Sequence, residues 1–132
     1  MSRANADVVR PLYALWDAAD VDPMVGLLDA DVVASAPEGW PESGPTLGRA
    51  DVLAQMRSVR ANFEDQTMLI DRIETKGDRV VTGHRVLARG KRSGLDAEFA
   101  NSGAFRLQAG KIIEARFFWD HDEALNAAGL AE

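Results

Sequence analysis

The second half of the chain alternates between apolar and polar residues, and three short turn motifs interrupt this alternation. The motifs are Lys-Gly-Asp at 76–78, Gly-Lys-Arg-Ser-Gly at 90–94 and Gln-Ala-Gly at 108–110. Glycine-containing turns between alternating segments are typical of β-hairpins. The pattern therefore predicts four strands, linked as successive hairpins into an antiparallel meander. These strands cover residues 67–74, 79–89, 95–107 and 111–119.

The first half of the chain has helical periodicity. Apolar residues recur at intervals of three and four over 5–19 and over 49–63, which predicts an amphipathic helix in each segment. Pro11 in the first of them indicates its first turn or a kink. Between the two, Asp22 followed by Pro23 is typical of a helix start, so a short second helix is predicted with Asp22 as its N-cap.

One strand and one long loop separate the second and third of these helices. Residues 31–36 are predicted to form a strand, and 37–48 contain three prolines and three glycines, which predicts a loop without regular structure. A short helical segment closed by Gly129 ends the chain. Three N-terminal helices followed by a meander predict an α+β domain in which the helices cover one face of a curved sheet.

Composition and charge narrow the classes of partner. The 132 residues suffice for one domain with its own core, and the chain has no cysteine, which excludes disulfides and thiolate chemistry. Its net charge of −6 opposes a phosphate backbone, so nucleic acid and membrane surfaces are not expected as partners. The sequence has neither an apolar leader nor a run of about 18 apolar residues, and a cytoplasmic location is expected. A small neutral ligand fits this composition.

Strand alternation assigns the side chains of the meander to two faces. On 95–107 one face is apolar except for Asn101, and this face is assigned to the interior. On 79–89 the arginines share one face, which leaves His84 on the interior face. The hairpin between these strands pairs residues whose numbers sum to about 185, so His84 is predicted to lie opposite Asn101. The next hairpin is predicted to place Asn101 beside Phe117.

Three segments, GWPESGPTLGRADVLAQM, FRLQAGKI and DEALNAAGL, carry a resemblance to a known family. With the order of elements, they resemble the SnoaL-like branch of the nuclear transport factor 2-like superfamily, over nearly the whole chain as one domain, 1–132. The resemblance implies a cone-shaped curved antiparallel sheet packed against three N-terminal helices, with a deep apolar pocket. The superfamily includes ketosteroid isomerases, limonene epoxide hydrolases and scytalone dehydratases, so the resemblance leaves the reaction open.

The resemblance places the pocket on the inner face of the sheet. There His84 is a candidate general acid or base, and Asn101 is a candidate orienter of its imidazole or oxyanion donor. The alternative for both is a structural pair, in which a neutral His84 is satisfied by Asn101. The predicted walls of the pocket are Tyr13, Trp16, Trp40, Met56, Val86, Phe99, Phe117 and Trp119.

A charged cluster follows the last aromatic residues. Asp120 and Glu123 have the spacing of a capping box, which favours a helix start over a catalytic cluster. His121 shares its strand face with Trp119, so His121 and Asp120 rank second as catalytic candidates near the pocket rim. The chain has two histidines whose spacing fits no metal motif, so no metal and no other cofactor is assigned.

The sequence departs from the active sites of the families that it resembles. The positions that hold a tyrosine and two carboxylates in the isomerases fall near Leu12, Ala36 and Gly103 in this chain. Of the catalytic positions of the epoxide hydrolases, only the one at His84 holds a side chain that can bind a proton. Two functions stay open. One is binding of a small, largely apolar, ring-containing molecule, with cofactor-free acid–base chemistry of the isomerase, cyclase or hydratase type at His84. The other is a non-catalytic binding or homodimerisation module, with the outer sheet face as the predicted dimer contact.

Overall fold

Four long hairpin strands form the body of the sheet, as the turn motifs predict. The structure, a computed structural model, describes residues 2–37, 45–90 and 96–130. Its helices are α1 (Ser2–Asp17), the 3-10 helix η1 (Asp22–Gly26), α2 (Arg49–Arg60) and α3 (His121–Ala128). Its strands are β1 (Leu28–Ser35), β2 (Pro45–Leu47), β3 (Phe63–Lys76), β4 (Arg79–Gly90), β5 (Asp96–Gln108) and β6 (Lys111–Phe118).

The sheet is mixed. Its strands lie in the order β2-β1-β6-β5-β4-β3, and β3 to β6 pair with their chain neighbours as antiparallel hairpins. Strand β1, however, runs parallel to β6, with Ala34 beside Ala115. The prediction of a purely antiparallel sheet is therefore wrong at this junction. Because β1 and β6 lie far apart in the sequence, no turn motif signals their pairing.

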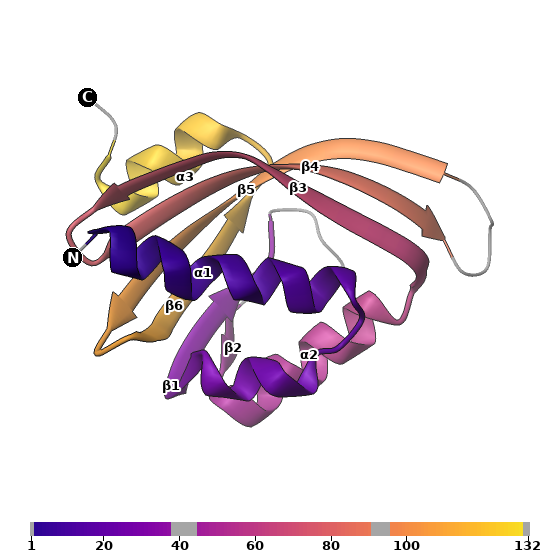
Figure 1. Cartoon of the computed structure of the whole chain (residues 1–132), viewed down its shortest axis with the longest axis horizontal. Helices are drawn as coiled ribbons and strands as arrows, with labels where there is room; N and C mark the ends of the chain where they lie inside the picture. Colours follow the sequence, from indigo (N-terminus) through magenta and orange to yellow (C-terminus); the bar gives the residue numbers. More distant parts are fainter. Residues whose placement is uncertain (1, 38–44, 91–95, 131–132) are drawn as a thin grey trace.

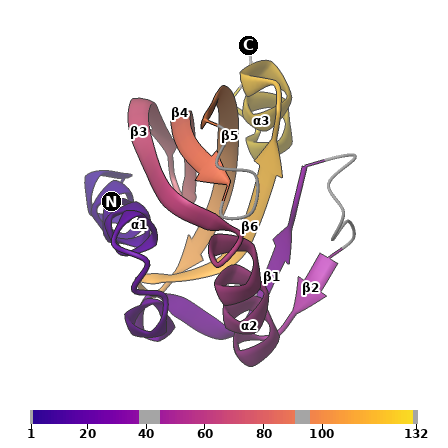
Figure 2. The same ribbon diagram turned by 90° about the vertical axis from the view of Figure 1, so that its right-hand side faces the viewer.

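Helices cover both faces of the curved sheet. Figures 1 and 2 show α1 and α2 on one side of it, the inner face, and α3 against the other, the outer face. The prediction of three N-terminal helices is confirmed only in part, since the second is a 3-10 segment of five residues and the third α-helix is C-terminal. The short final helix ends at Gly129, whose φ of 74° is left-handed, as the sequence predicts.

Two apolar cores lie on the two faces. The main core fills the space between the N-terminal helices and the inner face, and includes the fully buried Val9, Met24 and Phe105. A smaller cluster lies under α3, where Ala104 of β5 packs against Ala124. The helix α3 thus covers part of the face that the sequence assigns to solvent or to a dimer contact.

Three local features differ from the predictions. Val21, not Asp22, precedes η1 as its cap residue, and the Asp22 carboxylate pairs with Arg57 at 2.7 Å. The segment predicted to be irregular contains β2, a strand of three residues that is too short to show an alternation. Helix α2 ends at Arg60, three residues before the predicted end, because β3 already begins at Phe63.

Hairpin register decides which side chains meet on the inner face. His84 pairs with Asn101, as predicted from the turn between β4 and β5. Phe117, however, pairs with Gly103 instead of Asn101. The hairpin between β5 and β6 has a two-residue turn and a β-bulge, and together they move the pairing by two residues from the predicted one. Asn101 therefore lies beyond the paired end of β6.

Candidate ligand-binding cavity

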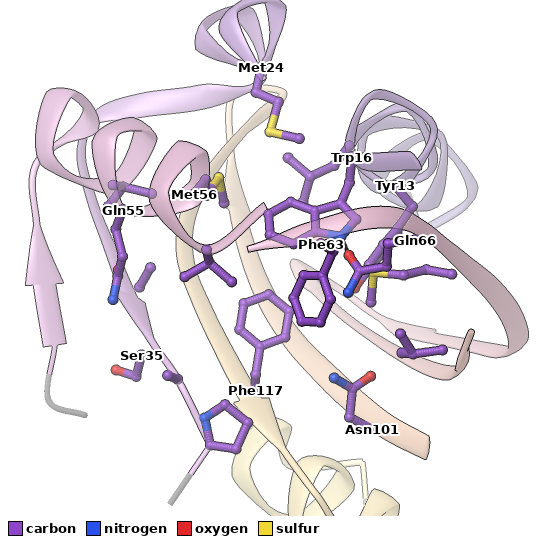
Figure 3. Close-up of a pocket in the computed structure, with 18 of the residues that line it drawn as sticks. Tyr13, Trp16, Met24, Ser35, Gln55, Met56, Phe63, Gln66, Asn101 and Phe117 are labelled. Carbon is purple, nitrogen blue, oxygen red and sulfur yellow. Dashed lines mark hydrogen bonds between the residues drawn. The ribbon is translucent and has the colours of Figure 1, made fainter. Parts of the chain in front are cut away.

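A cavity of about 150 Å³ lies between α1, α2 and the inner face of the sheet. Those of its lining residues that the structure describes are uncharged and mostly apolar. Figure 3 shows rings from α1, β3 and β6 converging on it, and Met24, Met56 and Met68 contribute flexible thioether side chains. Flat aromatic walls combined with adaptable methionines suit a compact apolar ligand.

Most of the predicted wall residues are found at this cavity. The six that line it are Tyr13, Trp16, Met56, Val86, Phe99 and Phe117. Trp40 lies outside the described residues. Trp119 is 45% exposed and does not line the cavity, although its ring lies 5.9 Å from that of Phe99 in an edge-on arrangement. The role of these side chains in binding stays a prediction.

Three polar residues of the lining were not predicted. Gln66 is 7% exposed, and it was missed because the predicted strand began one residue later. Gln66 lies two residues before Met68 on β3, so both side chains point to the same face of the sheet. Extending the predicted strand by one residue would therefore have placed Gln66 on the inner face. Ser35 and Gln55 lie at the opposite end of the cavity from Asn101 (Figure 3). They belong to β1 and α2, and no local pattern in the sequence marks them.

A chain of four hydrogen-bonded side chains runs along the inner face. The Tyr13 hydroxyl lies 3.0 Å from Thr82 Oγ1, Thr82 Oγ1 lies 2.7 Å from His84 Nε2, and His84 Nδ1 lies 2.6 Å from Asn101 Oδ1. An amide oxygen only accepts, so His84 Nδ1 carries the proton and donates it to Asn101. His84 Nε2 then accepts from Thr82, which accepts from Tyr13. Both ends of the chain, Tyr13 and Asn101, line the cavity.

His84 faces inward, as the alternation predicts, but it lies behind the cavity wall. It is 2% exposed, and it does not itself line the cavity. The Tyr13 ring covers it with a centroid separation of 4.5 Å, and both of its ring nitrogens are hydrogen-bonded. Direct contact between His84 and a molecule in the cavity is therefore blocked. A proton would have to pass through the hydroxyls of Tyr13 and Thr82.

Burial lowers the pKa of His84 below its ordinary value, and the hydrogen bond to Asn101 opposes this effect. The unfolded chain therefore takes up a proton at this residue near pH 6.5, while the folded chain does so at lower pH. The contribution of neutral His84 to stability is present above about pH 6.5 and is lost as the pH falls. We expect the free energy of unfolding to decrease on acidification through this range, and His84→Gln to remove this part of the decrease. An NMR titration that gives His84 a pKa at or above the ordinary value would contradict the burial argument.

His121 lies on the outer face of the sheet, away from the cavity. Its Nδ1 is 2.8 Å from Ser102 Oγ, and its Nε2 is 3.3 Å from Glu74 Oε1. Gly83 makes room for the ring, since a Cβ there would lie 3.1 Å from Nδ1. The expected position at the pocket rim is wrong, because the chain turns after Trp119 and carries α3 onto the outer face.

The neighbours of His121 hold α3 in place. Ser102, His121 and Glu74 have the composition of a nucleophilic triad, but Ser102 is 2% exposed, so its hydroxyl is closed to a substrate. Asp120 is the N-cap of α3, and its carboxylate accepts the backbone N–H of Asp122 at 2.9 Å. This agrees with the capping interpretation, and Asp120 is not among the residues that line the cavity.

The described residues contain neither a cluster of metal ligands nor a membrane-spanning helix. Within residues 2–37, 45–90 and 96–130, no three potential metal ligands gather. In the same ranges no helix is long and apolar enough to cross a membrane. The predictions of a cytoplasmic location and of a chain without cofactor or metal stay predictions.

Comparison with known proteins agrees with this architecture. A family model described as a SnoaL-like domain matches residues 9–115, and no curated protein matches the chain by sequence. A nuclear transport factor 2-like protein of unknown function from Burkholderia pseudomallei superposes with a TM-score of 0.80 at 22% identity, over 96% of this chain and 97% of that one. A Jannaschia protein described as a SnoaL-like polyketide cyclase gives a TM-score of 0.81 at 18% identity, over 99% and 94%. An LEH-like epoxide hydrolase from M. tuberculosis gives 0.75 at 18% identity, over 98% and 94%. At these identities, the similarity shows the fold alone.

Proposed function

This chain belongs to the SnoaL-like domain family, and from that premise we propose that its inner cavity binds a small, largely apolar molecule that contains a ring. The cavity volume of about 150 Å³ carries the proposal. An apolar cavity of about this size is known to hold one benzene-sized molecule. Aromatic and methionine side chains line it, and they suit such a ring better than an extended polar ligand.

Methionine methyl groups give a direct test of this binding. Met24, Met56 and Met68 all line the cavity, so their methyl resonances report on its contents. We expect toluene or methylcyclohexane to shift these resonances saturably in the chain labelled at the methionine methyls, and to raise the melting temperature. Glycerol, which is polar and of similar length, is the control and is expected to leave them unchanged. Methyl resonances that do not respond to either ring would reject the proposal.

Acid–base chemistry at His84 is the second candidate function. The hydrogen-bonded chain supports it, because Tyr13 and Asn101 connect a neutral, buried imidazole to the cavity at two points. In this candidate a proton leaves the bound molecule through the hydroxyls of Tyr13 and Thr82 and reaches His84, and Asn101 orients the ring. Turnover that disappears in His84→Gln while the methyl shifts persist supports catalysis. Binding without turnover in the native chain supports the non-catalytic module.

We also propose that the uncovered part of the outer face forms a homodimer contact. Leu69 and Leu87 are 44% and 40% exposed there, beyond the edge of α3. Arginine and carboxylate side chains surround them, including the Arg89–Asp96 pair, which suits a second copy of the same face. We expect Leu87→Asp to shift a concentration-dependent dimer to monomer in sedimentation. The matched control is Leu47→Asp at the exposed β2 edge, and an equal effect of both substitutions would contradict this contact.

A further inference from the structure

Two primary amides stand on the sheet wall of the cavity, and both have their carbonyl oxygen engaged. The indole N–H of Trp16 donates to Oε1 of Gln66. An indole nitrogen is a donor and never an acceptor, so this bond fixes the Gln66 amide with its oxygen toward Trp16. The Gln66 NH₂ group must then point elsewhere. Figure 3 shows this nitrogen turned away from the indole.

His84 fixes the orientation of the Asn101 amide in the same way, by binding its carbonyl oxygen. Asn101 Oδ1 accepts a hydrogen bond from His84 Nδ1 at 2.6 Å, and Thr82 Oγ1 satisfies the other ring nitrogen. The Tyr13 hydroxyl lies 3.0 Å from Thr82 Oγ1. In Figure 3 the Asn101 nitrogen lies on the side toward Phe117, facing the cavity. The orientation of this amide is thus set by groups behind the wall, independently of any ligand.

The two amide nitrogens are open to the cavity. Within the described residues, neither Gln66 Nε2 nor Asn101 Nδ2 has a hydrogen-bond partner, yet no fully buried polar atom there is unsatisfied. Gln66 is 7% exposed and lines the cavity, so its free N–H groups face that space. The cavity wall therefore offers N–H donors from two amides whose carbonyl oxygens are already hydrogen-bonded to other side chains. The described lining residues include no charged side chain.

We propose that the ligand is a neutral ring compound that carries a carbonyl oxygen, such as a cyclic ketone, and that one of the two amides, Gln66 or Asn101, donates to that oxygen. This inference rests on the proposed binding function and adds the polarity of the ligand. An amine or another donor would leave the amide N–H groups unpaired. A carboxylate would lose its hydration in a cavity whose described lining residues include no cation, and this costs more than burying a neutral carbonyl.

The test compares cyclohexanone with methylcyclohexane in the native chain, Gln66→Met and Asn101→Leu. Binding is measured by the methionine methyl shifts, and the ratio of the two Kd values cancels effects that act on both ligands equally. We expect the substitution that removes the donor amide to weaken cyclohexanone binding about fivefold relative to methylcyclohexane, the ratio that one net hydrogen bond of about 1 kcal/mol gives, and the other substitution to leave this ratio unchanged. The side-chain NH₂ resonances of that donor amide are expected to shift with cyclohexanone and to stay fixed with the hydrocarbon.

The outcomes separate this inference from the binding function. Equal changes for both ligands in both variants, or methylcyclohexane binding without cyclohexanone binding, would overturn the carbonyl preference and leave the cavity function intact. Failure of both ligands to bind the native chain would reject the binding function itself, and the inference with it. Should a variant not fold, the NH₂ resonances of the native chain decide: fixed resonances on cyclohexanone saturation overturn the inference, and shifted ones support it.

Discussion

Replacing Arg60 by methionine is expected to lower the free energy of unfolding by about 3 kcal/mol. Arg60 is 6% exposed, and its guanidinium donates to three backbone carbonyls, those of Trp16, Asp17 and Phe63, at 2.8, 3.3 and 3.2 Å. Two of these carbonyls lie at the end of α1, and the third begins β3. The Trp16 carbonyl also accepts the backbone N–H of Ala19 at 3.0 Å. Methionine fills similar space but removes the guanidinium bonds from all three carbonyls and leaves the Trp16 carbonyl with the Ala19 N–H alone. Urea unfolding followed by circular dichroism measures the loss.

Arg57→Met is the matched control for this prediction, since Arg57 lies on the same helix. Its ion pair with Asp22 joins side chains that are 52% and 78% exposed. Pairs of this kind contribute at most about 1 kcal/mol. Equal destabilisation by the two substitutions would mean that Arg60 acts through its charge alone, and not by satisfying buried carbonyls.

Replacing Val86 by phenylalanine is expected to weaken binding of a small ring about 100-fold, which corresponds to about 2.7 kcal/mol. Val86 is 1% exposed, and it lines the cavity beside Phe99 and Met68, its partners on β5 and β3. A phenyl group there enters a space of about 150 Å³ and occupies the volume that a benzene-sized ligand would take. Because the ring enters empty space, the free energy of unfolding is expected to change by less than about 1 kcal/mol.

Leu87→Phe provides the comparison for Val86→Phe. Leu87 follows Val86 on β4 and faces the other side of the sheet, where it is 40% exposed. The same phenyl group on that face is expected to leave the affinity for toluene unchanged. Methyl-shift titration measures both variants. An affinity of Val86→Phe equal to that of the native chain would show that the ring binds outside this cavity.

Local patterns predicted the parts of the fold that neighbouring residues encode. The turn motifs and the alternation of β4 and β5 predicted that His84 and Asn101 meet on the inner face, and the structure confirms this pairing. The same method missed the pairing of Phe117 by two residues, because neither the exact position of the turn nor the β-bulge in the β5–β6 hairpin leaves a mark in an apolar–polar alternation. It also placed His121 at the cavity, since strand parity was carried past the end of β6.

The sequence by itself determined the hairpins, the faces of their strands and the aromatic character of the inner face, because a turn and a pleat depend on residues next to each other in the chain. The tertiary structure alone decided that β1 lies parallel to β6, that α3 covers part of the outer face, and that the Tyr13 ring separates His84 from the cavity. It also brought Trp16 to Gln66, and this bond fixes the orientation of the Gln66 amide. These contacts join segments that are distant in sequence. They depend on the packing of the whole chain, and a local sequence pattern contains no information about that packing.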